Sequence, residues 1–359
     1  MSSKATAYII FYGITFFVFF GMHYYVFLGL NRCFRFGSPK TVMLLFTLLA
    51  LAFPLCSILE KFYPNGFSML LYAASSIWLG VLFLLLTAFL LYEPLRFFIK
   101  PNAHRGLVIV GIVALVSLYA LIMGQLIFTK QVDIRLANLS GPVSIAHLSD
   151  VHVGTIHNSG YLARVIEKTN NLNPDLVVIT GDFFDGLGPV NQHTVAPLAN
   201  ISAPAYFVIG NHERYSDMQR VVELMSGAGV TTLRNRVIET HGLQLVGADY
   251  PERENQRDNP YLKDMTIKPD SPAVLLYHQP SGIEDALRAG IDLQLSGHTH
   301  SGQMFPFNLL TRLFFPYLEG LYVIESLQLY VSPGSGTWGP PMRLGSRNQV
   351  TLITLLPQR

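Results

Sequence analysis

The sequence predicts an α/β domain that follows a four-helix transmembrane region. Only 13% of its 359 residues are charged and 50% are hydrophobic, whereas about a quarter of the residues in ordinary soluble domains are charged. Residues 1–129 hold eight Lys or Arg and two Asp or Glu, while residues 130–359 hold 17 and 21. After Val143, short β-branched runs alternate with amphipathic stretches, as in a sheet covered by helices. We therefore expect an anchor over residues 1–130 and a separate domain over residues 131–359.

Four long apolar runs fill the first part of the chain. None contains a charged residue, and each approaches or exceeds the roughly 20 residues that a helix needs to cross the hydrocarbon core. Four buried core helices in succession would have almost no polar face, so we interpret the runs as membrane spans. They cover Tyr8–Leu30, Thr41–Leu59, Ser68–Tyr92 and Leu107–Phe128.

The short loops between these runs predict the orientation. The positively charged loops follow the first and third runs, and contain Arg32, Arg35 and Lys40, and Arg96, Lys100 and Arg105, respectively. Cytoplasmic loops carry the excess of Lys and Arg, so we expect a multi-pass protein of the cytoplasmic membrane with its second domain outside, in the periplasm. Lys130 and Arg135, just after the last run, weigh against this orientation.

The second part alternates between predicted strands and helices. The strands are expected at Val143–Leu148, Leu176–Thr180, Ala205–Ile209, Leu243–Gly247, Ala273–Tyr277, Asp292–Leu295, Tyr322–Ile324, Gln328–Val331 and Gln349–Leu355. Helices are expected at Ser159–Asn171 and at Asp217–Ala228, the second with Ser216 as its N-terminal cap. Tyr250–Asp270 is polar and flanked by proline, and is expected to form a long surface loop.

Potential metal ligands follow five of these strands. In chain order they are Asp150 and His152, Asp182 and Asp185, Asn211 and His212, His278, and His298 and His300. Open α/β sheets bind ligands at the carboxyl ends of their strands, and alternate residues of an extended segment point the same way. Carboxylate, imidazole and amide groups together suit Mn²⁺, Fe or Zn²⁺. The pattern therefore predicts a metal site at the strand ends.

These five blocks, in this order, resemble the calcineurin-like metallophosphoesterase superfamily from His147 to the C-terminus. The resemblance implies a four-layer α/β/β/α sandwich with two divalent metal ions, of which Mn²⁺ is the first expectation. It implies one metal held by Asp150, His152, Asp182 and His300, and another held by Asp182, Asn211, His278 and His298. It further implies that His212 protonates the leaving oxygen or stabilises the phosphoryl group, and that Asp185 orients His212.

Two features point to one branch of that superfamily. Gly186 follows Asp185, where the Ser/Thr protein phosphatases have an arginine, which argues against a phosphoprotein substrate. The segments 296–303 and 330–343 resemble the bacterial, often membrane-anchored phosphodiesterases. Some relatives hydrolyse the pyrophosphate of UDP-2,3-diacylglucosamine, so the resemblance implies a lipid-linked phosphate as substrate.

The segment Met304–Leu318 contains four Phe, four Leu and a single charged residue, Arg312. It is too short and too interrupted by proline to span a bilayer. It is either a packing segment or an interfacial segment in which Phe314 and Phe315 contact a lipid. Arg343 is a candidate for bidentate binding of a substrate phosphate, and a surface role or a structural ion pair is the alternative.

Together these features predict a hydrolase of phosphoric ester or pyrophosphate bonds, namely a membrane-anchored phosphodiesterase or pyrophosphatase acting on a lipid-linked phosphate outside the cytoplasmic membrane. One alternative is a cytoplasm-facing pyrophosphatase for a UDP-2,3-diacylglucosamine-type substrate. Another is a metal- or lipid-binding sensor without catalysis. No nucleic-acid partner is expected, because the basic residues of the first part lie beside apolar runs. The sequence gives no prediction of the oligomeric state.

Overall fold

The structure is a computed structural model that describes residues 3–187, 191–214, 216–251 and 258–358. Within them, the side chains of residues 3–16 and of Pro39 lie outside the description. The chain divides into two compact units. The first comprises Met1–Leu121 with Gly339–Pro341, and the second comprises Ile122–Trp338 with Met342–Arg359.

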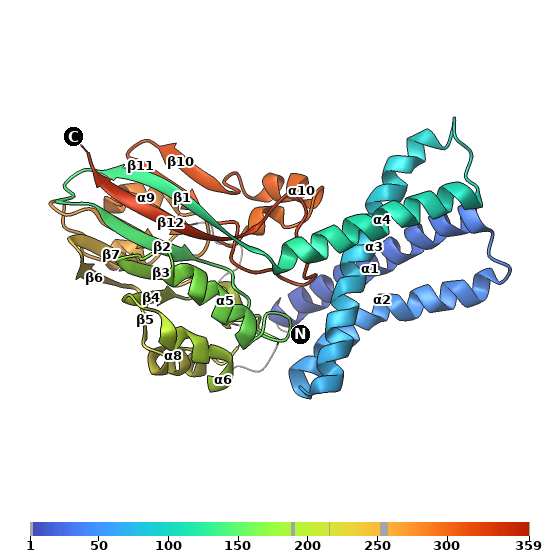
Figure 1. Ribbon diagram of the computed structural model, residues 1–359, viewed down its shortest axis with the longest axis horizontal. Coiled ribbons are helices and arrows are strands. Elements are labelled where there is room, and N and C mark those ends of the chain that lie inside the picture. Colours follow the sequence, from blue (N-terminus) through green and yellow to red (C-terminus); the bar gives the residue numbers. More distant parts are fainter. Residues whose placement is uncertain (1–2, 188–190, 215, 252–257, 359) are drawn as a thin grey trace. The chain divides into compact units, whose positions relative to one another are not determined.

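The first unit is built from long apolar helices (Figure 1). They are α1 (Ser3–Phe34), α2 (Pro39–Phe62), α3 (Gly66–Leu95) and α4 (Ala103–Gln125). Among the described residues, the segments Lys40–Phe62, Gly66–Leu95 and Ala103–Gln125 are long and apolar enough to cross a membrane. The first predicted run falls within α1, part of whose side chains lie outside the described residues. The count of four spans therefore stays a prediction.

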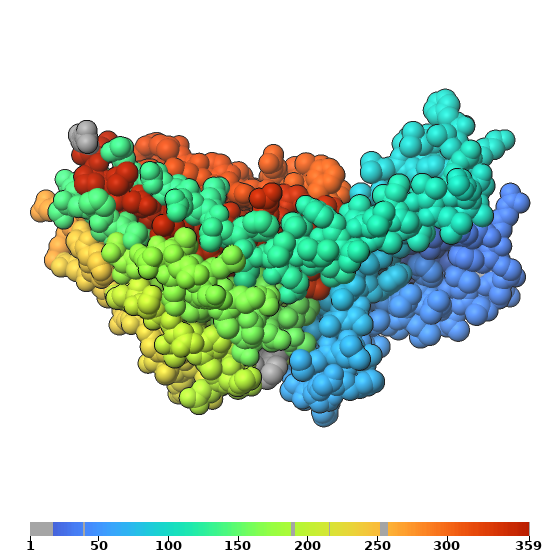
Figure 2. Space-filling model, viewed as in Figure 1, coloured from blue at the N-terminus to red at the C-terminus, as the bar shows by residue number. Residues whose placement is uncertain are grey.

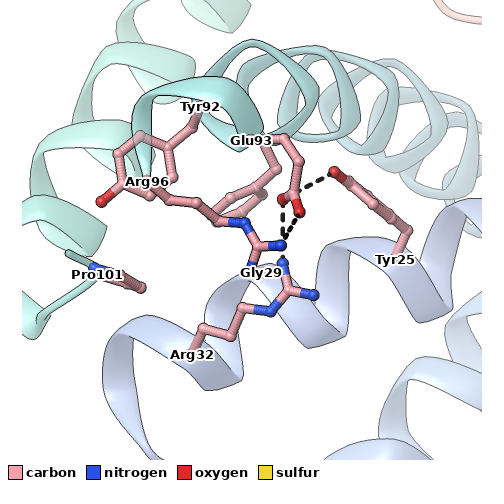
Figure 3. Close-up of a pocket in the computed structure, with 8 residues that line it drawn as sticks. Tyr25, Gly29, Arg32, Tyr92, Glu93, Arg96 and Pro101 are labelled. Carbon is pink, nitrogen blue, oxygen red and sulfur yellow. Dashed lines mark hydrogen bonds and ion pairs between the residues drawn. The ribbon is translucent and has the colours of Figure 1, made fainter. Parts of the chain in front are cut away.

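Polar contacts fix the ends of these helices. Asn65 caps α3 by accepting hydrogen bonds from the backbone N–H groups of Phe67 and Ser68. At the other end of α3, Glu93 forms ion pairs with Arg32 at 3.1 Å and with Arg96 at 2.7 Å (Figure 3). The hydroxyl of Tyr25 donates to the same carboxylate at 3.3 Å. Two of the arginines used to predict the orientation therefore share an acidic partner that ties α1 to α3.

The second unit contains two six-stranded sheets within its described residues. The first runs in the order β1 (Ile127–Leu136), β12 (Asn348–Pro357), β2 (Val143–Leu148), β3 (Leu176–Thr180), β4 (Ala205–Val208) and β5 (Val230–Thr232). The second runs β10 (Gly320–Ile324), β11 (Leu327–Val331), β9 (Leu293–Ser296), β8 (Ala273–Leu276), β7 (Leu243–Gly247) and β6 (Arg236–Thr240). Strands β2 to β5 are parallel, as are β7, β8, β9 and β11.

The two sheets pack face to face, because their strands are apolar on both sides. Ile145 and Val178 of the first sheet share a buried cluster with Leu245 and Val274 of the second. On the outer faces, α5 (Ser159–Asn170) and α8 (Met218–Gly227) cover the first sheet, and α9 (Ile283–Ala289) covers the second. The predicted α/β/β/α sandwich is thus confirmed.

Several local predictions need correction. Strand β1 begins at Ile127, inside the last predicted apolar run, and was not expected because that run included its first residues and Lys130 interrupts its apolar face. The cap of α8 is Asp217, whose carboxylate accepts two backbone N–H groups, and not Ser216. The predicted surface loop Tyr250–Asp270 buries Tyr250 and Leu262. Residues 252–257 of that loop lie outside the described part of the chain.

Candidate metal centre

The carboxyl ends of five strands from both sheets deliver the predicted ligands to one place. Asp150 follows β2, Asp182 follows β3, Asn211 follows β4, and His278 follows β8. His298 and His300 both follow β9. Within the described residues, two groups have ligand atoms that all lie within 4.8 Å of one another. They are Asp150, His152 and His300, and Asp182, His278 and His298.

The first cluster is buried and tightly held. The Nε2 atoms of His152 and His300 lie 3.0 Å apart, and His300 Nε2 lies 3.5 Å from Asp150 Oδ1. The Asp150 carboxylate accepts the backbone N–H of His298 at 3.0 Å and the hydroxyl of Ser149 at 2.5 Å. Two imidazole nitrogens that face each other beside a carboxylate leave a common point for a cation between them.

The second cluster centres on His278. Its Nε2 lies 3.1 Å from Asp182 Oδ2, 3.1 Å from Asn211 Oδ1 and 3.0 Å from His298 Nδ1. On the other side of the ring, Nδ1 of His278 donates to the carbonyl of Thr180 at 2.8 Å. A histidine oriented in this way by a backbone carbonyl presents its second nitrogen to a metal. The four groups of the predicted second site therefore converge.

The backbone is left-handed at five of these residues. Asp150, His152, Asp182, His298 and His300 have φ values of 51°, 51°, 50°, 72° and 48°. Each such conformation costs a non-glycine residue about 1–3 kcal/mol and persists where the surroundings impose it. The sharp turn it makes after each strand directs the side chain back over the sheet edge, where the ligand atoms meet.

Glycines allow the turns to approach one another. A Cβ atom at Gly210 would lie 2.3 Å from Asp182 Oδ1, and one at Gly297 would lie 2.2 Å from Asp150 Oδ2. Both distances are far below van der Waals contact. The glycine that precedes Asn211 and the glycine that precedes His298 are therefore required for the carboxylates to reach the cluster.

Burial sets the protonation of the histidines. It lowers the pKa of His298 to about 3 and the pKa values of His152 and His300 well below their usual range. These rings are therefore neutral and carry the lone pair that a metal needs. Burial also acts to lower the pKa of His278, but the charge of Asp182 outweighs it and raises the pKa to about 9. A cation bound by both groups would displace that proton.

His212 lies beside the first cluster, and its ring centroid is 4.6 Å from that of His152. Its Nδ1 lies 2.8 Å from the backbone carbonyl of Asp185, so the main chain of Asp185 orients the ring. The Asp185 carboxylate forms a separate cluster with His152 and His212. Burial acts to lower the pKa of His212, but the charge of Asp182 and the bond to Asp185 outweigh it and raise the pKa.

Arg343 is placed differently from the prediction. It is fully buried, and all five of its N–H groups are used within the protein. They donate to the carbonyls of His300, Pro333 and Gly336 and to the side chains of Ser346 and Asn348, at 2.6–3.1 Å. The guanidinium therefore holds the His300 loop and is not available to a substrate phosphate.

The aromatic neighbours of the centre were only partly predicted. The Phe315 ring lies 5.2 Å from that of His298, whereas Phe314 is exposed to solvent. Tyr250 lies 5.9 Å from His278, and Trp338 lies 6.2 Å from His212. Tyr250 follows β7, so the strand-end rule that identified the ligands could also have identified it.

Glu213 is a further residue whose role the sequence did not reveal. Its buried carboxylate accepts the backbone N–H groups of Asp182, Phe184 and Gly210 at 2.8–3.1 Å. It thereby joins the turns after β3 and β4. Burial raises its pKa to about 7. Glu213 directly follows Asn211 and His212 in the sequence, but that position gives no sign that its side chain binds the backbone.

The arrangement agrees with a known family. Residues 143–302 match the family described as calcineurin-like phosphoesterases. Over these residues the chain is similar to that family. The matched residues include every predicted metal ligand, and the two sheets are completed outside the match by β1, β10, β11 and β12.

Relatives with metallophosphoesterase in their names match part of the chain. The chain is 35% identical over 236 residues to an uncharacterized metallophosphoesterase of Helicobacter pylori, covering 64% of each chain. It is 36% identical over 242 residues to a transmembrane protein with metallophosphoesterase domain from Bos taurus, covering 62% of this chain and 54% of the relative. The matches thus span less than two thirds of these relatives. A dimetal phosphatase from Danio rerio aligns with 60% of this chain and 98% of its own at 13% identity and a TM-score of 0.36.

Proposed function

We propose that the protein is a binuclear metal-dependent phosphohydrolase. The observation that carries the proposal is the convergence of two ligand clusters, rich in neutral histidine and carboxylate, at the strand ends of the metallophosphoesterase domain. Two divalent cations bound there would supply Lewis-acid stabilisation of the phosphoryl charge and an activated water at neutral pH. Mn²⁺ is the proposed metal, and Fe or Zn²⁺ would suit the same ligands.

The residues of the centre would have different roles in the reaction. Asp150, His152 and His300 would hold one cation, and Asn211, His278 and His298 would hold the other, with Asp182 contributing to both. His212, whose raised pKa favours the protonated ring, would donate a proton to the leaving oxygen. The carbonyl of Asp185, at 2.8 Å from Nδ1, keeps that ring in place.

The substrate proposed is a lipid-linked phosphodiester or pyrophosphate. Support comes from the apolar helices that precede the domain and from the transmembrane relative in Bos taurus. The distribution of Lys and Arg between the loops favours an anchor over residues 1–130 and a catalytic domain at the outer face of the cytoplasmic membrane.

Metal-dependent hydrolysis tests the activity. The full-length protein in detergent should hydrolyse bis(p-nitrophenyl) phosphate, lose turnover with a chelator, and regain it with Mn²⁺. Asp182→Asn should lower turnover by more than about 100-fold, because even groups that only support a metal ligand cost about 10–100-fold when removed. Asp292→Asn is the matched control, since the Asp292 carboxylate accepts the backbone N–H of Ala273 and belongs to neither ligand cluster. Turnover that survives both chelation and Asp182→Asn would overturn the proposal.

Reporter fusions test the orientation. Alkaline phosphatase joined after Arg359 should be active, because it matures only outside the cytoplasm, whereas green fluorescent protein at the same position should stay dark. The reverse pattern would favour the cytoplasm-facing pyrophosphatase.

The lipid fraction of cells that lack the protein tests the substrate. A phosphorylated or pyrophosphorylated lipid intermediate should accumulate and should disappear on incubation with the purified protein. An unchanged lipid profile, together with full activity on soluble diesters, would exclude the lipid-linked substrate and keep the hydrolase.

A further inference from the structure

The helix that follows the metal centre has its apolar side outward. In α10 (Phe307–Phe314), Leu313 is 77% exposed, whereas Thr311 is the buried member of the helix. A surface helix normally buries its apolar stripe and exposes its polar residues. We call the exposed apolar side chains of this segment the α10 surface, and they are Phe305, Phe307, Leu309, Leu310, Leu313 and Phe314. The segment containing α10 and β10, in orange, lies at the surface of its unit (Figure 2).

The α10 surface is held at the rim of the metal centre. Before the helix, the backbone N–H of Phe305 donates to the carbonyl of Leu344 at 2.7 Å. After the helix, Phe315 packs on the ring of His298. The hydroxyl of Thr299, between the two histidines of the last metal block, donates to the carbonyl of Leu318 at 2.6 Å. The end after the helix is therefore fixed to the loop that carries His298 and His300. The end before it is fixed to the loop that contains Arg343.

Strand register places this rim at the end of the domain where α4 joins it. Strand β1 is parallel to β12, with Lys130 opposite Thr351, and β12 is antiparallel to β2, with Thr351 opposite His147. The carboxyl end of β2, which leads to Asp150, therefore lies beside the start of β1. Figure 1 shows α10 and the start of β1 toward the same end of this unit.

Hydrogen bonds connect the last turn of α4 to the centre. Within the second unit, Asn348 Nδ2 donates to the carbonyl of Gly124 at 2.7 Å, and Asn348 Oδ1 accepts from Arg343 at 2.8 Å. Arg343 in turn donates to the carbonyl of His300 at 2.7 Å. Only Leu126 separates the end of α4 from β1. The end of a helix apolar enough to cross a membrane is thus tied to a predicted metal ligand.

We propose that the α10 surface rests on the lipid bilayer that α4 enters, so that a lipid phosphate reaches the strand-end centre from the plane of the membrane. The occupant is a bilayer because the surface lies at the end of the domain joined to α4. Arg312 is the only charged residue between 301 and 318, so no acidic group in the segment repels anionic headgroups. The access of a lipid phosphate to the centre rests on the proposed function, whereas the contact of the α10 surface with the bilayer does not.

A fluorescent label tests the contact directly. In the full chain with Cys33→Ser and Cys56→Ser, Leu313→Cys carries an environment-sensitive fluorophore, and the protein is placed in nanodiscs that hold one copy each. The label at 313 should shift its emission to the blue and be quenched by spin-labelled lipids. A label at Glu284→Cys, on the exposed side of α9, should show neither effect.

Activity gives an independent readout. The variant Leu309→Ser with Leu313→Ser should hydrolyse bis(p-nitrophenyl) phosphate as the unmodified chain does. Its turnover of a nitrophenyl phosphodiester of a diacylglycerol carried in the nanodisc should fall by about 10-fold or more, because burial of two leucine side chains in the bilayer contributes at least that factor. Glu284→Ser should lose neither activity.

Three results would overturn the membrane contact. They are a label at 313 that behaves like the label at 284, a blue shift that appears only when a disc holds two copies, and an equal loss on both esters. If the unmodified chain hydrolyses neither ester, the proposed function fails, and lipid quenching at 313 still decides where the α10 surface lies.

Discussion

The strand-end centre and the α10 surface are neighbours, and each reverses the usual distribution of residues. The centre buries polar groups, whereas the α10 surface exposes apolar ones. At the centre, Asp150 and His278 are buried, whereas on α10 Leu313 and Phe314 are exposed. Buried charge and exposed apolar area both cost free energy unless something compensates them. The difference is what the two proposals explain: cations would compensate the buried charge of the centre, and an apolar phase would cover the exposed side chains of α10.

The two regions also differ in how they are held. The centre is fixed by buried hydrogen bonds, such as those of Arg343 and Glu213, and by left-handed backbone at five of its predicted ligands. The α10 surface is fixed by contacts at its two ends and by the packing of α10 on the turn at Gly302, while its apolar side chains stay exposed. Changes at the centre should therefore have the larger consequences, and changes far from both should have the smallest.

His212→Gln should produce the largest effect after loss of Asp182. If His212 protonates the leaving oxygen, hydrolysis of an alkyl phosphodiester should fall by about 10²–10⁴-fold. A nitrophenyl ester should lose much less, because its leaving group needs no proton. The ratio of kcat values for the two esters is the measurement, and an equal fall on both would assign His212 to binding alone.

Arg343→Lys should weaken metal binding by about 10–100-fold, as expected for a group that supports a ligand. Lysine cannot bond the carbonyls of His300, Pro333 and Gly336 at once, so the His300 loop would loosen. The Mn²⁺ concentration for half-maximal activity reports this effect. Arg347→Lys is the control, since Arg347 is exposed and lies over the Phe128 ring. A change in KM without a change in the Mn²⁺ requirement would instead indicate that Arg343 contacts the substrate phosphate.

A pH dependence of stability should give the smallest effect. Burial lowers the pKa of His157 to about 3, and its Nε2 accepts the backbone N–H of Thr337 at 3.0 Å. The unfolded chain binds this proton near pH 6.5 and the folded chain does not, so stability is lost as the pH falls below 6.5. Lowering the pH from 7.5 to 5.5 should cost about 1.4 kcal/mol through this residue.

Urea unfolding of the full chain, followed through Trp338 in a Trp78→Phe background, measures that slope. His157→Gln should reduce the pH dependence by the stated amount, whereas His193→Gln, at an exposed position, should leave it unchanged. Equal slopes for all three proteins would show that His157 keeps a normal pKa.

Much of the fold and of the centre could be predicted because the signals are local. Strands β2, β3 and β7 were predicted with their observed bounds, and the helix after Asn158 begins at Ser159 as expected. The ligand pairs Asp150 with His152 and His298 with His300 are each separated by one residue, so their chemistry is visible in the sequence. Their roles as metal ligands stay predictions that metal binding must test.

The tertiary structure decided what depends on distant partners. From the sequence Arg343 is a candidate phosphate ligand. In the structure its five N–H groups bond other parts of the protein, including the carbonyl of His300, 43 residues away. Strand β1 exists because β12, more than 200 residues later, pairs with it. The exposure of α10 could not be predicted either, since an apolar run is compatible with a helix packed in the core as well as with an exposed interfacial helix. The sequence alone determined which residues are candidate metal ligands, because ligand type and spacing are local. The folded chain decided which of them meet, and which end of the sheets adjoins α4, because only long-range pairing sets those relations.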